Sequence, residues 1–186
     1  MTARKFDKIS SIFDLALINS IARPAPIEFE VASMVIDRAN GKSEVIYPHQ
    51  MWRDILQKTY GVFLFQEDLL SVLNKIGGFC LSESVCILKN MCKKNLEKNV
   101  QSENQFVENV KTKGISTNVA KSIFREMVSS SSYLFNRSHA ISYVTFSYIS
   151  MWLKPNYNKE WNDSIKEWTE HAAKLKAEDD CVLSDE

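Results

Sequence analysis

The chain has 186 residues, of which 45% are hydrophobic and 25% charged, and it contains only 5 Gly and 4 Pro. Its formal net charge of zero divides into a basic body, with 20 Lys/Arg against 14 Asp/Glu in residues 1–159 (net +6), and an acidic end, with 3 against 9 in residues 160–186 (net −6). This composition excludes global disorder and a turn-rich all-β fold, and the lack of a run of about 18 apolar residues or of a signal-type segment predicts a cytoplasmic protein without a membrane partner.

The first predicted helix covers residues 12–21, an apolar run that follows a capping pattern of Ser11 and Asp14. The Arg-Pro-Ala-Pro sequence of residues 23–26 then ends this helix, because proline lacks a backbone donor and restricts the residue before it. We expect this segment to be extended.

A second helix is predicted from about residue 28 to 38, followed by an irregular stretch, 42–60, with one strand-like patch at 45–47. The β-branched and aromatic residues of 59–67 predict a short extended piece that enters a helix. That helix carries apolar side chains at helical spacing and ends at Gly77-Gly78.

Further helices are predicted at about 82–91, up to about 113, from a Thr117 cap onward, and from the 136–139 segment to Trp152. A last helix, 158–177, has an amphipathic face of apolar residues spaced by three or four, and residues 178–186 form an acidic tail that we expect to be disordered. The fold class is therefore all-α, with at most one or two very short strands, in a helical domain of residues 1–157.

The predicted helix start at Asn136-Arg137-Ser138-His139 is the first candidate site. Asn136 or Ser138 can cap the helix, so free N–H groups and the positive end of the helix dipole gather beside Arg137, which suits a phosphate. His139 and Tyr143 are four residues apart and share one face, where they can present a donor and a stacking ring. On helix physics alone, a capped helix end with a surface Arg and two partly buried rings explains the same residues.

A second candidate is the group Lys89, Lys93 and Lys94, two of which lie on one helical face. They can neutralise phosphates, although lysines near a helix C-terminus are also ordinary partners of the helix dipole.

Carboxylates occur together at Gln66-Glu67-Asp68, where first-turn capping explains them without catalysis. A two-metal site needs carboxylates from separate elements, and the sequence offers no second group. The four cysteines and three histidines match no metal-ligand spacing. The sequence therefore predicts no catalytic residue, no metal site and no cofactor bound by this chain alone.

Four of these segments resemble, in order, motifs of the bacterial DNA polymerase III alpha subunit, a C-family replicative polymerase, in its fingers region. Arg23–Pro26 resembles Arg-Pro-Gly-Pro, Thr59–Glu67 resembles Thr-Tyr-Gly-Val-x-x-Tyr-Gln-Glu, Met91–Lys94 resembles Met-Gly-Lys-Lys, and Phe135–His139 resembles Phe-Asn-Lys-Ser-His. The resemblance spans roughly residues 5–157.

In that family the fingers close over the incoming dNTP and the primer–template DNA. The resemblance therefore implies nucleotide-binding roles for Lys89, Arg137, His139 and Tyr143, with Lys93 and Lys94 on the phosphate side. Arg23 would belong to the turn at the base of the fingers and, as a cation, to the DNA- or phosphate-binding set.

The sequence also departs from the family pattern. The family's Arg-Arg pair becomes Leu88-Lys89, and a lysine does not replace a planar guanidinium. Glycines of the family motifs become Ala25 and Cys92, so the backbone must differ there if those positions need positive φ.

The family's palm, whose aspartates hold Mg²⁺, has no counterpart in this sequence. We therefore expect no DNA synthesis by this chain alone and a palm-bearing polymerase polypeptide as its partner. Two alternatives stay open: a non-catalytic module that binds nucleic acid or a polymerase, and a structural remnant or fragment.

Overall fold

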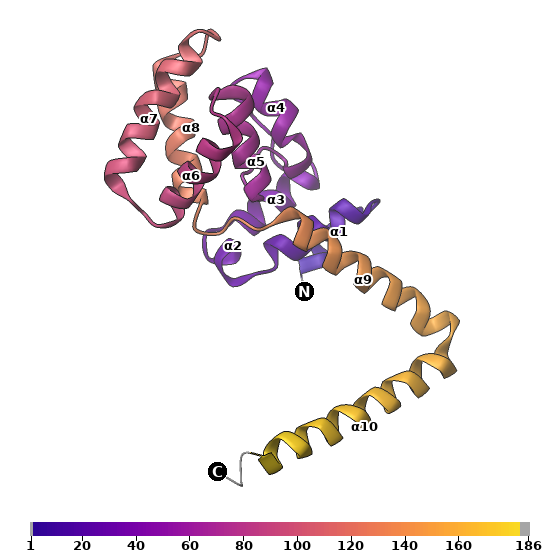
Figure 1. The fold of residues 1–186 in the computed structure, drawn as a ribbon. Helices are drawn as coiled ribbons and strands as arrows, with labels where there is room; N and C mark the ends of the chain where they lie inside the picture. The colour runs from indigo at the N-terminus through magenta and orange to yellow at the C-terminus, as the bar shows by residue number, and fades with distance from the viewer. Residues whose placement is uncertain (1, 183–186) are drawn as a thin grey trace. The chain divides into compact units, whose positions relative to one another are not determined.

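The computed structural model describes residues 2–182, with side chains up to residue 175. It divides into two compact units, Met1–Val144 and Thr145–Glu186, which are described separately (Figure 1). Helices make up the regular structure of the described residues. The one exception is an isolated parallel bridge between Phe65 and Phe135. The predicted all-α class is confirmed.

A short 3-10 helix, η1 (Thr2–Lys5), precedes α1 (Ile12–Ile21). The N–H of Asp14 donates to Ser11 Oγ at 3.2 Å, and the N–H of Ser11 donates to Asp14 Oδ2 at 2.9 Å. This reciprocal capping box begins the helix at the predicted residue.

The proline segment is helical rather than extended, which corrects the prediction. α2 (Pro24–Glu28) has Pro24 at its first position. A backbone N–H at this position makes no hydrogen bond within a helix, so its absence in proline costs nothing, and the fixed φ of proline favours a helix. α3 (Val31–Ala39) begins three residues later than expected because Glu30 adopts a left-handed conformation, with φ of 58°. It ends close to the predicted Asn40-Gly41 boundary.

The stretch predicted as irregular contains a helix, α4 (Gln50–Leu56), and a 3-10 turn, η2 (Gln57–Thr59), and the strand-like patch at 45–47 forms no strand. Trp52 and Leu56 lie four residues apart and are both buried, so one face of α4 packs into the core. The N-cap is unusual, since His49 Nδ1 accepts from the N–H of Met51, and it adds to the weakness of the local helix signals in this stretch.

The extended piece before residue 66 enters α5 (Gln66–Ser71) as predicted, and η3 (Val72–Ile76) continues it as a π-helix. A Cβ at Gly77 would lie 2.6 Å from the carbonyl oxygen of Leu73 and 2.8 Å from the Phe106 ring, so glycine permits the close approach of this turn to α7.

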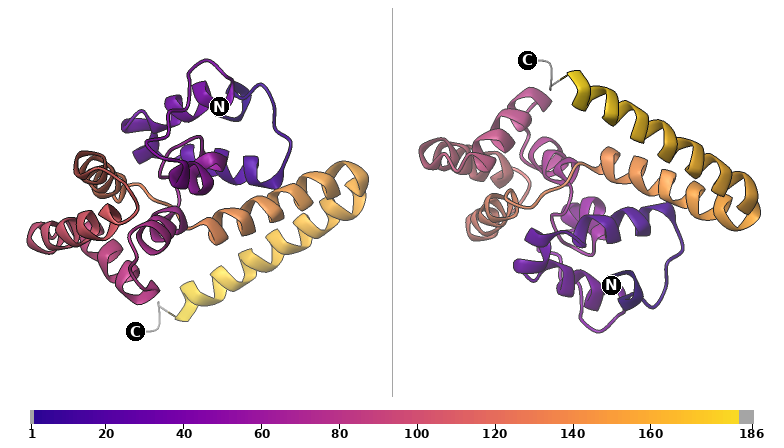
Figure 2. Two further views of the ribbon diagram at one scale, coloured as in Figure 1. Left: turned by 90° about the horizontal axis from the view of Figure 1, so that it is seen from above. Right: turned by 90° about the horizontal axis from the view of Figure 1, so that it is seen from below.

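α6 (Leu81–Cys92), α7 (Leu96–Lys111) and α8 (Thr117–Ser130) complete the helical part of the first unit that precedes α9. α7 and α8 pack side by side, with the rings of Phe106 and Phe124 5.7 Å apart (Figures 1 and 2). Buried apolar side chains form one cluster among α4 to α8, which Phe63 joins, and a second among α1, α3, the start of α9 and the residues Val62, Leu64 and Phe65.

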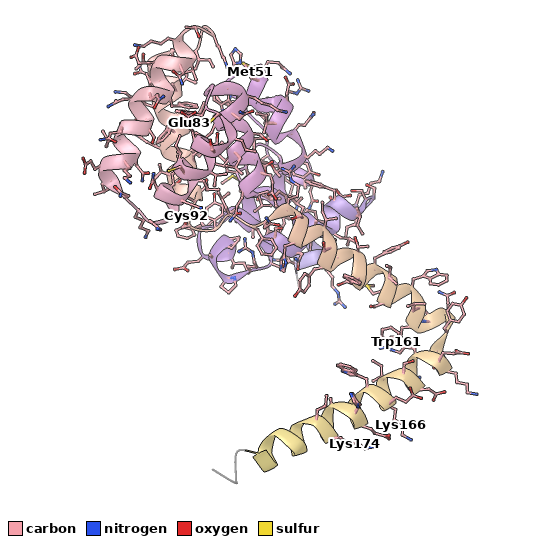
Figure 3. All side chains as sticks on the ribbon, viewed as in Figure 1. Met51, Glu83, Cys92, Trp161, Lys166 and Lys174 are labelled. Carbon is pink, nitrogen blue, oxygen red and sulfur yellow. The ribbon has the colours of Figure 1, made fainter. Side chains whose placement is uncertain are left out.

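α9 (Arg137–Asn156) begins in the first unit and includes Pro155, which was expected just beyond the helix, within its last turn. In the second unit the chain reverses direction after α9 into α10 (Asn158–Val182) (Figure 2). Figure 3 shows the side chains of Trp161, Lys166 and Lys174 along α10. The helix thus includes residues 178–182, five residues past the predicted end, and 183–186 lie outside the described residues. Among the described helices none is long and apolar enough to cross a membrane.

Candidate nucleotide and nucleic-acid interface

The start of α9 is capped by Asn136, one of the two residues that the sequence offered. Asn136 Oδ1 accepts from the N–H of His139 at 2.8 Å and from the hydroxyl of Ser138 at 2.6 Å. The geometry therefore matches the predicted N-cap, and Ser138 supports the capping side chain rather than acting as the cap itself.

The free N–H groups and the cation at this helix start are engaged by carboxylates of α5. The N–H of Arg137 donates to both carboxylate oxygens of Glu67, at 3.0 Å each, and its guanidinium forms an ion pair with Asp68. Asp68 is 1% exposed and also accepts from the N–H of Phe65 at 3.2 Å. The place that the sequence assigned to a phosphate thus already holds two anionic groups of the protein. We call Glu67, Asp68 and Arg137 the carboxylate clasp.

Burial raises the pKa of Asp68 from 3.8 to about 6. The charge and hydrogen bonds of Arg137 and the N–H of Phe65 act in the opposite direction, and the neighbouring Glu67 adds to the rise. Desolvation therefore outweighs the attraction of the partner cation, as is common for buried ion pairs.

His139 and Tyr143 come together on one face of α9 as predicted, with ring centroids 4.4 Å apart. The His139 ring also meets Phe135 edge-on at 5.4 Å, and Tyr143 is 60% exposed. Both residues are exposed, so the ring pair forms an aromatic surface one turn from the helix start.

Arg23, predicted to contact phosphate, ties α2 to the segment before α9. Its Nη2 donates to the carbonyl of Tyr133 at 2.6 Å, its Nε donates to the carbonyl of Ser20 at 2.9 Å, and its guanidinium lies 4.3 Å from the centre of the Phe135 ring. Burial lowers the pKa of Arg23 below its usual value. These contacts account for the arginine structurally, so a phosphate contact stays a prediction.

Lys89, Lys93 and Lys94 are exposed at the end of α6. Lys93 is the C-cap, and Lys94 occupies the following left-handed position with φ of 54°, where glycine is usual. The N–H of Asn95 returns to the carbonyl of Asn90 at 3.0 Å and closes the turn. The two replaced glycine positions, Ala25 and Cys92, do not have positive φ.

Two further contacts relate α6 to its surroundings. Leu88, which stands in place of the first arginine of the family pair, is 7% exposed and belongs to the core. Cys92 Sγ lies 3.6 Å from the carbonyl of Ser131, so the end of α6 adjoins the segment that leads to α9. Burial raises the pKa of the Cys92 thiol.

Sequence reasoning gave Glu67 and Asp68 only a local capping role. Asp68 does cap α5, and one acceptor suffices for that cap. The other carboxylate, that of Glu67, accepts from the N–H of Arg137, which is 70 residues away in the chain. The signal that can reveal such a pair is a surplus carboxylate in a first turn together with an arginine at another helix start.

The described side chains bring together no group of three or more His, Cys, Asp or Glu residues that can hold a metal ion. Glu67 and Asp68 are adjacent carboxylates, but both are bound to Arg137, so they do not fit a two-metal site.

A family model, "Bacterial DNA polymerase III alpha subunit finger domain", matches residues 5–114. The chain therefore belongs to this family. Curated relatives named DNA polymerase III subunit alpha are similar over most of its length: that of Bacillus subtilis is 33% identical over 150 residues, which cover 81% of this chain and 13% of the relative. Those of Buchnera aphidicola (strain Sg) and Escherichia coli (strain K12) are 30% and 29% identical and cover 80% and 82% of this chain, or 13% and 14% of their own lengths. The chain thus spans about an eighth of these relatives.

Proposed function

We propose that this chain supplies the fingers of a C-family DNA polymerase: it contacts primer–template DNA and the incoming dNTP, and a palm-bearing polypeptide performs phosphoryl transfer. The observation that carries the proposal is the exposed lysine group of α6 in a chain of the finger-domain family. Mg²⁺ would be held by the palm carboxylates of that partner, whose chemistry requires it.

The conformation of Lys94 supports a phosphate-binding role for the lysine group. A non-glycine residue in the left-handed region costs about 1 kcal/mol or more, and such strain is often retained at functional sites. Glu30 and Tyr60 share this conformation, but among these three Lys94 is the one that belongs to an exposed basic group, which supports a role for its charge.

The aromatic surface of His139 and Tyr143 supports the nucleotide part of the proposal. Stacking of a base on an exposed ring contributes roughly 1–3 kcal/mol without requiring a particular sequence. Lys89 stands at a position that resembles a triphosphate contact of the family, whereas the guanidinium of Arg137 is already paired through Nη2 with Asp68.

The test is binding of a fluorescein-labelled primer–template duplex to the full chain, measured by anisotropy at several salt concentrations. Changing Lys89, Lys93 and Lys94 together to Ala should weaken binding about tenfold or more at low salt. The slope of log affinity against log salt should become shallower by up to about 3, because binding releases fewer counterions when three phosphate contacts are missing.

A matched control changes the exposed Lys5, Lys8 and Lys42, which carry the same total charge elsewhere in the first unit. This variant should retain most of the affinity. Equal loss in both triple variants, or salt-independent binding by the unchanged protein, would contradict a localised phosphate site.

A second candidate function is a binding module without catalysis. Two observations favour it: Leu88 is buried where the resemblance has an arginine, and Arg137 is already paired with Asp68. Two cations that a triphosphate site would use are therefore absent or already paired, whereas the exposed α6 lysines remain available to a DNA backbone.

Primer extension separates the two candidates. The chain is co-purified with a palm-bearing polypeptide from the same source, and nucleotide incorporation is measured with Mg²⁺. Incorporation that depends on both polypeptides supports the first candidate, whereas DNA binding with no gain in incorporation supports the second.

A further inference from the structure

We propose that Glu67 and Asp68 are positioning residues for the start of α9: they do not touch the nucleotide, but they fix Arg137 and through it the exposed His139–Tyr143 ring pair. The presentation of these rings to a nucleotide rests on the proposed function. Its structural part, the dependence of the α9 start on two carboxylates of α5, can be tested separately.

The clasp lies next to the only bridge between extended segments that the described residues contain. The N–H of Phe135 donates to the carbonyl of Leu64 at 3.0 Å, and the N–H of Gln66 donates to the carbonyl of Phe135 at 2.9 Å. These two bonds place residue 66 and residue 135 side by side. The start of α5 and the start of α9 therefore begin from one paired point.

From this paired point the carboxylates reach the first residue of α9 in two ways. Both carboxylate oxygens of Glu67 accept from the backbone N–H of Arg137, and Asp68 accepts from its guanidinium. The guanidinium carbon also lies 5.2 Å from the centre of the Phe65 ring. Backbone and side chain of the same residue are thus held by neighbouring residues of another helix, which fixes the first turn of α9.

Stability alone does not account for the ion pair. Asp68 is 1% exposed, and the Nε of Arg137 is buried without a hydrogen-bond partner. Burying such a pair costs desolvation, and hydrophobic residues of similar volume often serve as well or better. The role that the proposal assigns to the pair is therefore geometric: it holds Arg137 in one position at the start of α9.

The geometry that the clasp defines is that of the rings. His139 follows Arg137 by two residues and Tyr143 lies one turn further, with ring contacts that run from Phe135 through His139 to Tyr143. A first turn that frays would release His139 from Phe135, and the exposed ring surface would lose its orientation.

The experiment measures amide hydrogen exchange by NMR in the full chain. Glu67→Ala should increase exchange about tenfold at the amides of residues 137–141, as expected for the loss of a hydrogen bond to a helix start, while the amides of α7 and α8 keep their protection. Glu67→Gln retains one acceptor oxygen and should restore protection to within about threefold of the unchanged protein. Asp68→Asn should increase exchange at residues 137–141 by a smaller factor, because the backbone bond to Glu67 remains.

Glu83→Ala is the matched control, because Glu83 accepts from the N–H of Cys80 at 2.8 Å and caps α6 (labelled in Figure 3). It should loosen the α6 start and leave residues 137–141 unchanged. Unaltered exchange at 137–141 in Glu67→Ala, or an equal increase throughout the first unit, would overturn the proposal.

Anisotropy with the labelled primer–template, with and without a dNTP, supplies the functional readout. Glu67→Ala should reduce the gain in affinity that the dNTP produces about tenfold, whereas Glu67→Gln should restore most of it and the salt slope set by the lysines should not change. An unchanged dNTP-dependent gain would refute presentation of the rings by the clasp. If the unchanged protein binds neither DNA nor dNTP, the proposed function fails, while the exchange result still decides the positioning role.

Discussion

The two basic regions singled out by sequence, the end of α6 and the start of α9, differ in what surrounds their cations. The lysines of α6 are exposed, and Lys94 occupies a left-handed turn position. Arg137 of α9 is instead two-thirds covered and paired with the buried Asp68. The same formal charge is therefore available to an anionic ligand in one region and already compensated in the other.

Because of this difference, substitution of an α6 lysine and substitution of Arg137 should affect different properties of the protein. A cation with no anionic partner acts mainly through the ligand, so its removal should change binding and not folding. A cation that compensates a buried carboxylate acts mainly through the fold, and its removal leaves an uncompensated charge.

The largest expected effect follows from removing the compensated cation. Arg137→Ala should lower the free energy of unfolding at pH 7.5 by about 3 kcal/mol, the lower end of the range for breaking a buried pair, because the arginine itself is one-third exposed. Urea denaturation measures it. Lys89→Ala should change the same quantity by less than about 0.5 kcal/mol, and comparable losses in the two variants would remove the distinction between the regions.

A second prediction uses the titration of Asp68. Its folded-state pKa of about 6 lies above the unfolded value, so its contribution to stability is fully present below about pH 4 and is lost as the pH rises through 6. The difference in unfolding free energy between the unchanged protein and Asp68→Asn should therefore fall by on the order of 2–3 kcal/mol between pH 4 and pH 7.

Urea denaturation at intervals of half a pH unit measures this difference and cancels the other carboxylates, which both proteins share. A flat difference curve would mean that Arg137 offsets the burial of Asp68 completely. A curve that rises with pH would mean that the pair is net stabilising, which would weaken the reason for assigning it a positioning role.

The sequence predicted those features that depend on neighbouring residues. The capping box of Ser11 and Asp14, the Asn136 cap and the His139–Tyr143 face are all set within a few residues of chain, and each is found in the structure. Family membership, which depends on several motifs in order, was also predicted correctly.

The features that sequence reasoning missed depend on contacts between distant segments or on backbone geometry. The carboxylate of Glu67 meets a backbone N–H 70 residues away, and no local pattern encodes that pairing. The helix α4 was missed because tertiary burial of Trp52 outweighs weak local signals, and α2 because proline, a helix breaker in an interior, favours a first turn.

The smallest expected effect sharpens the account of the α6 lysines. At φ of 54°, glycine avoids the strain that a lysine side chain imposes, although its greater freedom in the unfolded state offsets part of the gain. Lys94→Gly should therefore raise the free energy of unfolding by up to about 1 kcal/mol, measured in urea, and should weaken primer–template binding severalfold at low salt, since one phosphate contact is lost.

Opposite changes in stability and binding are the informative result, because a lysine with a purely structural role cannot produce them. Lys93→Gly is the comparison: Lys93 has ordinary helical geometry at the C-cap, so glycine relieves no strain there and should only destabilise, while it removes the same charge. If Lys94→Gly lowers stability as Lys93→Gly does, or leaves DNA affinity unchanged, the left-handed conformation of Lys94 is unrelated to a phosphate contact.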